Sequence, residues 1–422
     1  MSGSSQSTNG KIRIAIILST YALRLAGQGV AFFLFARALG AENFGYIVAA
    51  LAVLSPISPF VDMGAYSIVS RDIALGRDPL LVIDENLTTM LFTFPAGLLL
   101  AVIFAHIANP GTNLVVLLMI GIAYLSLSRT SLLLAAIQNT MNHRIPVIFI
   151  EAVSAVLLVL LGIYGIVCGY TLFQWAFAYF IIGICVLFLS LLLIRKYVGK
   201  FSLKHWPNVK RIKEGLTFST GNSFQYVYTD IDKVVLLRFA TADLTGVYGM
   251  TIRIGSVFLI PIGAVYSLFY PRFIRSGHNL DIPIEKLLVR VLAISAAYSA
   301  ATFIGVSVIS NFIPRFLGED YLDVPGLLKV LVISVIFQIF QTPFADAITG
   351  FGYQIYRTVI QGSACVITLL STLVLIPGNP KYGVLHANLI VHGFLLLAYI
   401  TAYLYLRKTK ISMINVRIEN LV

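Results

Sequence analysis

The stretch "LFQWAFAYFIIGICVLFLSLLLI", residues 172–194, contains no charged residue and ends directly before Arg195 and Lys196. A helix that crosses the hydrocarbon core of a bilayer needs about 20 consecutive, mostly apolar residues. The stretch therefore predicts a transmembrane helix that ends at a basic membrane surface. The same pattern recurs along the chain, so the membrane decides the fold class.

The composition of the whole chain points to the same solvent. Of its 422 residues, 58% are hydrophobic and 11% are charged, and the mean hydropathy is +0.90. Typical soluble domains are about a quarter charged. A chain this apolar is predicted to be an integral membrane protein. Its three cysteines, Cys168, Cys185 and Cys365, have no paired spacing and are interpreted as packing residues.

We predict twelve transmembrane helices, which makes the fold all-α and polytopic. Proline and glycine punctuate several of them, and membrane helices tolerate these residues better than soluble helices do. The predicted spans cover residues 14–36, 46–69, 85–107, 112–137, 146–168, 172–194, 215–238, 246–270, 286–310, 325–349, 357–376 and 383–405.

The distribution of lysine and arginine predicts the orientation. With the N-terminus inside, twenty of these residues fall in cytoplasmic segments and four on the opposite side. The positive-inside rule then places both termini in the cytoplasm, and the even number of spans agrees. The net charge of +12 follows mostly from this bias, so it does not call for a nucleic-acid partner.

Two halves with similar signatures organise the chain. "RALGAENFG" begins at Arg37 and "RFATADLTG" at Arg238, and the arginine, acid and glycine positions share one offset. Because both halves begin in the cytoplasm, the repeat is parallel, with its axis along the membrane normal. The predicted parts are a tail, an N-lobe of six helices, a basic cytoplasmic linker, a C-lobe of six helices and a second tail: 1–13, 14–194, 195–214, 215–405 and 406–422.

Scattered motifs resemble one family of exporters. "LGAENFGYI", "DMGAYSIVSRDIA", "DIDKVVLLRFATADLTGVYGMTIRI" and "FLGEDYLDVPGLLKVL" resemble the polysaccharide exporters of the multidrug/oligosaccharidyl-lipid/polysaccharide superfamily. The chain looks most like the Wzx-type O-antigen and exopolysaccharide flippases. The resemblance implies two lobes arranged as a V around a central cavity. It also implies transfer of an undecaprenyl-diphosphate-linked oligosaccharide from the inner to the outer leaflet.

Ionisable residues inside predicted spans are candidates for a substrate site, because such residues usually face a bundle interior or an aqueous cavity. Arg24 lies near the middle of the first span, and Gln28 follows it at helical spacing. A guanidinium can bind phosphate with two hydrogen bonds. The alternative is a structural arginine paired with a carboxylate or with backbone carbonyls.

The stretch "YTDIDKVVLLRFA" lies in the seventh span and holds the other main candidates. Asn222, Tyr226, Asp230 and Lys233 fall along one broad helix face, which we interpret as substrate-binding. Asp230 and Asp232 are candidates for a coupling Na⁺ or H⁺, because related flippases place such a site in the second lobe. The alternative is an Asp230–Lys233 pair that neutralises itself.

Two further arginines complete the predicted substrate site. Arg129 and Arg253 are placed to contact a diphosphate, with snorkelling to the membrane interface as the alternative reading. No P-loop, no GxSxG motif and no metal-spaced histidine or cysteine cluster occurs in the sequence. We therefore expect a transporter with no catalytic residues, no metal site and no cofactor other than a coupling ion.

The sequence favours a flippase in the bacterial cytoplasmic membrane that works by alternating access. Its expected partners are a lipid-linked oligosaccharide, membrane lipids, a polysaccharide polymerase and a chain-length regulator. A cation-coupled multidrug exporter of the same fold is one alternative. A membrane polymerase or glycosyltransferase is another, and it would be expected to carry a large outer loop or an acidic catalytic motif.

Overall fold

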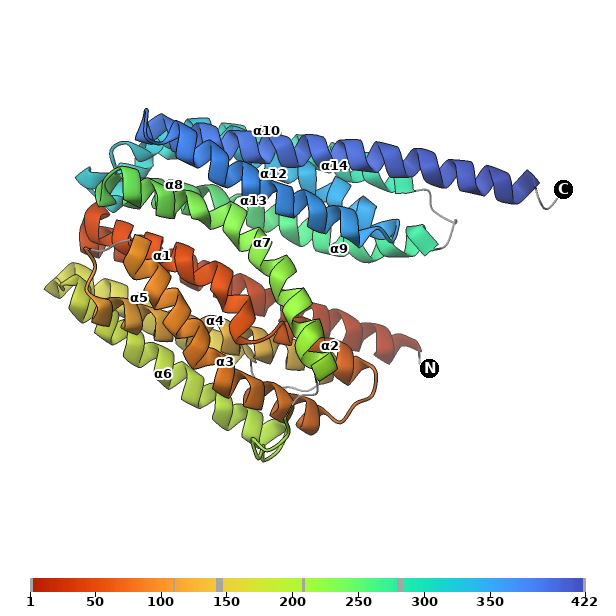
Figure 1. Cartoon of the computed structure of the whole chain (residues 1–422), viewed down its shortest axis with the longest axis horizontal. Helices are drawn as coiled ribbons and strands as arrows, with labels where there is room; N and C mark the ends of the chain where they lie inside the picture. Colours follow the sequence, from red (N-terminus) through yellow and green to blue (C-terminus); the bar gives the residue numbers. More distant parts are fainter. Residues whose placement is uncertain (1–2, 109–110, 142–146, 207–208, 279–283, 420–422) are drawn as a thin grey trace. The chain divides into compact units, whose positions relative to one another are not determined.

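The computed structural model describes residues 27–108, 111–138, 140, 147–206, 209–276 and 284–408, and within this part of the chain it contains helices and no strand (Figure 1). The α-helices are α1 (Gly3–Val61), α2 (Ala65–Ala74), α3 (Pro79–Ala108), α4 (Leu114–Met141), α5 (Val147–Cys168), α6 (Leu172–Tyr197), α7 (Val209–Phe239), α8 (Ala242–Val257), α9 (Leu259–His278), α10 (Ile284–Ile309), α11 (Ile313–Leu317), α12 (Val324–Gly350), α13 (Gln354–Leu375) and α14 (Pro380–Glu419).

The chain divides into two compact units, Met1–Asp230 and Ile231–Val422. The first unit contains α1 to α6 and most of α7, and the second contains the end of α7 and α8 to α14. The boundary falls inside a continuous helix because side chains in the first half of α7 bond to α1. The lobe limits drawn from the sequence remain a prediction.

Helix α1 consists of two helices merged across a kink, and the first two predicted spans lie on either side of that kink. It contains one non-helical residue, Gly40 (φ 74°, ψ 170°), within the motif "RALGAENFG". A positive φ of this kind is accessible to glycine at little cost. The second predicted span, 46–69, runs through the end of α1 into α2. Between them lies a corner in which Met63 (φ 49°) and Gly64 (φ 66°) are left-handed.

The end of α1 shows how an apolar helix tolerates proline. Pro56 and Pro59 lie inside it, and a proline cannot donate the backbone hydrogen bond expected at its position. The Ser58 hydroxyl donates to the Ser55 carbonyl instead, at 2.7 Å. The carbonyls of Pro59 and Pro56 accept from hydroxyls of α7, Ser219 at 2.7 Å and Ser223 at 2.8 Å.

The predicted eighth span, 246–270, is interrupted in the structure. The structure has α8 and α9, bent by 41° at a break around Phe258. Pro261 explains the break, since its nitrogen cannot donate to the carbonyl four residues earlier. That carbonyl belongs to Val257, and the carbonyl of the next residue, Phe258, accepts a hydrogen bond from the Tyr298 hydroxyl of α10 at 2.8 Å.

Nine helices in the described residues are long and apolar enough to cross a membrane, or ten if α8 and α9 count as one broken span. The first of them, Gly27–Ala74, holds two of the predicted spans. Helix α7 is absent from this set because acidic and basic side chains lie along it. The prediction of an all-α polytopic membrane protein is confirmed.

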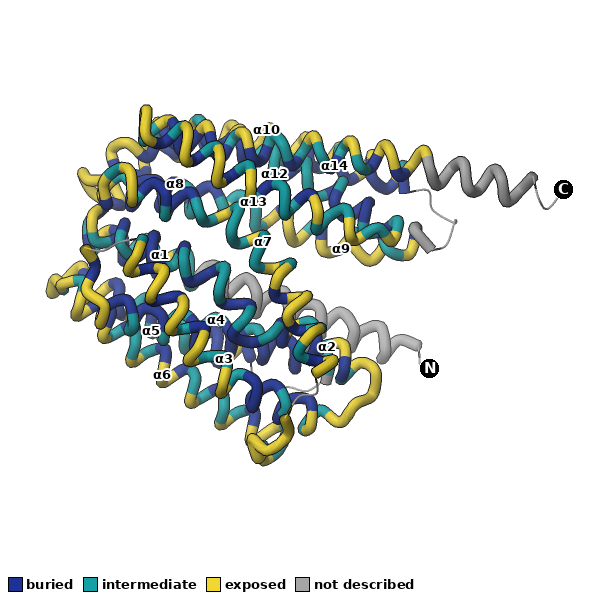
Figure 2. Tube along the Cα trace, in the orientation of Figure 1, coloured by how far each residue is buried: buried dark blue, intermediate teal, exposed yellow. Residues whose placement is uncertain are grey.

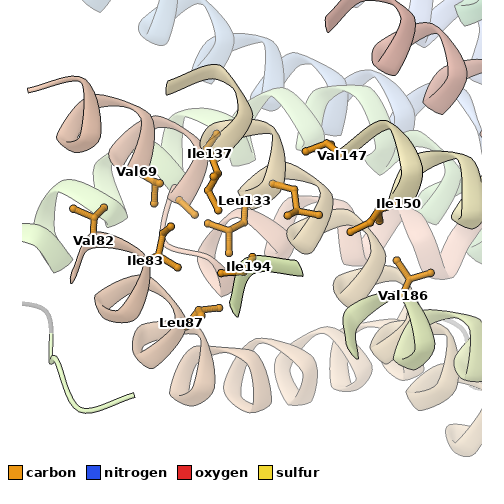
Figure 3. Close-up of a cluster of buried hydrophobic side chains, with 13 residues drawn as sticks. Val69, Val82, Ile83, Leu87, Leu133, Ile137, Val147, Ile150, Val186 and Ile194 are labelled. Carbon is orange, nitrogen blue, oxygen red and sulfur yellow. The ribbon is translucent and has the colours of Figure 1, made fainter. Parts of the chain in front are cut away.

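Buried apolar side chains hold each unit together, and buried and exposed residues alternate along the helices (Figure 2). A cluster in the first unit gathers side chains from five helices, α2 to α6, around Ile83, Leu133 and Ile194 (Figure 3). In the second unit the Tyr266 hydroxyl bonds the Ser295 hydroxyl at 2.7 Å and donates to the Ile339 carbonyl at 2.8 Å, which ties α9, α10 and α12.

Close approach of α4 and α6 depends on one glycine. A Cβ added at Gly183 would lie 2.7 Å from the Cα of Ala123, and backbone at that distance cannot move aside without shifting the helix. We expect Gly183→Ala to destabilise the protein by about 1–3 kcal/mol through overpacking. Gly263→Ala, where no atom lies within 4 Å, is the control. Equal melting temperatures of the two variants in detergent would contradict this packing argument.

Candidate functional site

Of the two site residues predicted in the first span, the structure describes the side chain of one. The side chain of Arg24 lies outside the described residues, so its role remains a prediction. Gln28 is half-buried on α1. Other candidates fall into two polar clusters, one in each unit, and each cluster is described by itself.

The first cluster is centred on a buried ion pair between α4 and the corner that follows α1. Arg129 and Asp62 have side chains only 4% and 3% exposed, and Nη1 of the arginine lies 3.4 Å from Oδ2 of the carboxylate. Asp62 also accepts a hydrogen bond from the backbone N–H of Gly64, at 3.1 Å. The alternative that Arg129 snorkels to the interface is therefore wrong, because its guanidinium is buried beside a carboxylate.

Tyr124 links this ion pair to α7. Its hydroxyl shares a hydrogen bond with Ser55 and lies within electrostatic range of Arg129, Tyr226 and Asp230. The structure thus brings together three residues that the sequence placed in a substrate or ion site, from α4 and α7. Asn222 is exposed on α7.

The second cluster lies where α7 enters the second unit. Asp232 and Lys233 have side chains 3% and 7% exposed, with Nζ 3.1 Å from Oδ1. The other carboxylate oxygen, Oδ2, accepts a hydrogen bond from the Tyr248 hydroxyl of α8. A charge transferred from water into a protein interior needs such partners. Lys233 therefore has Asp232 as a partner, which the sequence analysis did not consider.

Helix α14 brings two more polar side chains to the second unit's interior. His392 is 5% exposed and lies within electrostatic range of Lys233. Asn388, one turn away and 9% exposed, has a buried carbonyl oxygen with no hydrogen-bond partner among the described residues. Arg253 is half-buried on α8. Among the described residues, no group of histidine, cysteine, aspartate and glutamate could hold a metal ion.

A charge network ties the start of α7 to α2 and α3. Arg71 lies 2.7 Å from Glu214, and Arg77 lies 2.8 Å from Asp72. Arg77 also bonds Glu85 at 2.9 Å. Burial opposes its charge, yet the hydrogen bonds to both carboxylates raise the pKa of Arg77. The two arginines entered the sequence analysis only in the count of basic residues, and the pairing of Arg71 with Glu214, across 143 residues of chain, was not visible there.

The family model described as polysaccharide biosynthesis protein matches residues 12–276, which is more than half of the chain. The chain belongs to the polysaccharide biosynthesis protein family. No curated protein sequence matches the chain.

Solved transporter structures share the fold of this family member. The lipid II flippase MurJ in an inward closed conformation has a TM-score of 0.70 at 15% identity, covering 96% of this chain and 92% of its own. An inward-facing multidrug resistance MATE family transporter has a TM-score of 0.65 at 14% identity, covering 96% and 98%. The MATE multidrug transporter DinF-BH, solved as a complex, scores 0.65 at 15% identity, with 96% of both chains covered.

Two predictions are confirmed by the family and these folds. The predicted family resemblance is confirmed by the family match, and the predicted all-α, multi-pass membrane fold is shared with solved flippase and multidrug transporter structures. Tyr124 and Tyr248 are among the polar residues that the sequence analysis missed. Neither side chain carries a formal charge, and tyrosine is common in apolar helices, so neither residue stood out in the sequence.

The contribution of the buried Asp232–Lys233 pair to stability can be tested. Asp232→Asn leaves the lysine without its closest counter-charge, and breaking a buried pair costs about 3–5 kcal/mol. We expect a large fall in melting temperature in detergent. Asp232→Asn/Lys233→Met should recover most of the loss, because an apolar replacement of the lysine avoids the buried charge.

The matched control is Asp323→Asn, which removes the same charge from the exposed pair with Lys381, where the atoms are 2.7 Å apart. An exposed pair contributes about 0–1 kcal/mol, so little change is expected. If Asp232→Asn were as stable as Asp323→Asn, the buried pair would have no structural role.

Proposed function

We propose that this family member is a Wzx-type flippase, which moves an undecaprenyl-diphosphate-linked oligosaccharide from the inner to the outer leaflet of the bacterial cytoplasmic membrane. The observation that carries the proposal is the family match over residues 12–276. The fold shared with the lipid II flippase and the buried charges of both units support it.

The proposed mechanism lets the lipid tail stay in the bilayer while the headgroup crosses along polar side chains. Placing a diphosphate and sugar hydroxyls directly in hydrocarbon would cost many kcal/mol, so a polar path is required. Alternating access would expose this path first to one side and then to the other. Because Arg129 is paired with Asp62, binding a diphosphate there would require the arginine to exchange one anion for another.

The predicted substrate residues would contact different parts of the headgroup. Arg24, Arg129 and Arg253 would meet phosphate as charged donors. Gln28, Asn222, Tyr226 and Lys233 would donate to sugar hydroxyls, and a tyrosine ring also offers an apolar surface to a sugar face. Asp230 and Asp232 are the proposed ligands of a coupling Na⁺ or H⁺.

Exposure favours Asp230 over Asp232 as the ion ligand, since Asp230 is half-buried and Asp232 is only 2% exposed. Both oxygens of Asp232 are occupied, one by Lys233 and one by Tyr248. An ion bound there would have to displace the ammonium group. If Asp230 is the ligand, Asp230→Asn should abolish the dependence of transport on an ion gradient.

A cation-coupled multidrug exporter remains the second candidate, because MATE transporters share the fold. The buried Arg129, which is paired with Asp62, separates the two candidates, because an arginine suits an anionic headgroup better than a cationic drug.

In the proposed setting, both termini are cytoplasmic. A polysaccharide polymerase and a chain-length regulator would act on the transported product in the outer leaflet.

Deletion of the gene followed by lipid extraction tests the function. We expect an undecaprenyl-diphosphate-linked oligosaccharide to accumulate on the inner leaflet and surface polysaccharide to be lost, with both restored by the wild-type gene. A deletion strain with normal surface polysaccharide and raised sensitivity to cationic drugs would instead support the drug exporter.

Arg24 provides the sharpest mutational prediction. We expect Arg24→Ala to abolish flipping at normal membrane abundance, because phosphate loses its bidentate partner, and Arg24→Lys to retain part of the activity. The control is Arg315→Ala, since Arg315 is an exposed arginine at the end of α11. Surface polysaccharide in the complemented deletion strain is the measurement. Wild-type activity of Arg24→Ala would remove Arg24 from the site.

A further inference from the structure

The segment between α6 and α7 has an unusual charge content. Residues 195–213 contain seven lysines and arginines and no acidic residue. One of the seven, Arg211, is buried, and burial lowers the pKa of its guanidinium. The other six are exposed: Arg195, Lys196, Lys200, Lys204, Lys210 and Lys213.

This basic segment is fastened to α3 by one buried carboxylate. Asp84 is 1% exposed, and its Oδ1 accepts the backbone N–H groups of Ser202 and Leu203, both at 2.7 Å. Its Oδ2 accepts the Ser202 hydroxyl at 3.1 Å and the His205 N–H at 3.3 Å, and it lies 2.5 Å from the His205 ring. The lysines on this segment are therefore presented by a fixed backbone.

An aromatic contact of the same segment is of the kind expected at the membrane interface. The ring of Trp206, 59% exposed, packs edge-on against Phe92 of α3, with centroids 4.8 Å apart. Phe92 is itself 58% exposed and lies beyond the polar first turns of α3, on its apolar part. Tryptophan prefers this boundary, where its ring meets lipid and its N–H meets water.

We propose that residues 195–206 form a docking surface for anionic phospholipid headgroups, and we name it the linker surface. Its exposed cations are Arg195, Lys196, Lys200 and Lys204, and Trp206 anchors it to the lipid boundary. The occupant is a phospholipid phosphate of the leaflet that the positive-inside rule assigns to the cytoplasm. Charge complementarity carries the assignment, since no acidic side chain of the segment offsets these cations.

The linker surface is independent of the transport cycle proposed above. It requires neither a lipid-linked sugar nor a coupling ion, so it can be tested with purified protein in bilayers that contain no substrate. Failure of the flippase proposal would leave it untouched, and its own failure would leave the flippase proposal standing.

The chain offers its own probe, because it contains two tryptophans and only Trp206 is exposed. In a Trp175→Phe background, nanodiscs of neutral phosphatidylcholine would contain a small, equal fraction of either brominated phosphatidylglycerol or brominated phosphatidylcholine. Bromine quenches a nearby tryptophan, so quenching reports which lipid is enriched beside Trp206. We expect phosphatidylglycerol to quench at least about twofold more, since each basic residue can favour an anionic lipid by up to about fivefold.

Variants that remove charge distinguish lipid binding at the linker surface from a general attraction of anionic lipid to a basic protein. Lys196→Gln/Lys200→Gln/Lys204→Gln should abolish the preference for phosphatidylglycerol. The matched control, Arg272→Gln/Arg275→Gln/Lys286→Gln, removes the same charge from exposed positions of the second unit and should keep it. For the unsubstituted linker, raising the salt to about 0.5 M should also remove the preference. Equal quenching by both lipids at low salt, or an equal loss in both triple variants, would overturn the proposal.

Discussion

Backbone polar groups have no water to bond inside a bilayer, so each must find a partner within the protein. The prolines and helix ends of this chain show how that requirement is met. At the end of α1, the Ser58 hydroxyl bonds the Ser55 carbonyl, whose usual donor Pro59 lacks, and hydroxyls of Ser219 and Ser223 add bonds to the carbonyls of Pro59 and Pro56. Because two of these donors come from α7, the first unit extends into that helix.

The same constraint governs charge. An ionised side chain taken out of water requires a counter-charge and hydrogen bonds, and both units meet this requirement with a buried acid–base pair and a tyrosine. Asp62 and Arg129 lie beside Tyr124 in the first unit. Asp232 and Lys233 lie beside Tyr248 in the second. Helix α7 contributes side chains to both clusters, which explains why it carries more charge than its neighbours.

Hydropathy was sufficient to predict the fold class and most helices, because length and apolar content are local properties. It could not reveal that α8 and α9 break near Phe258 or that Tyr298 bonds the Phe258 carbonyl there, since such contacts join residues far apart in the sequence. The site was predicted in part. Helical spacing placed Tyr226 and Asp230 on one face, but Asp62 as the partner of Arg129 lies 67 residues away, a distance that no local pattern spans.

The fastening of the basic segment by Asp84 changes what trypsin would report on this protein. A run of exposed lysines between two helices would ordinarily be the first site of cleavage. Here the protease must pull Ser202, Leu203 and His205 away from a shared carboxylate before the chain can enter its cleft as an extended strand. The rate of a cut at Lys204 would therefore measure how often that stretch comes loose from α3, and not merely how accessible it is.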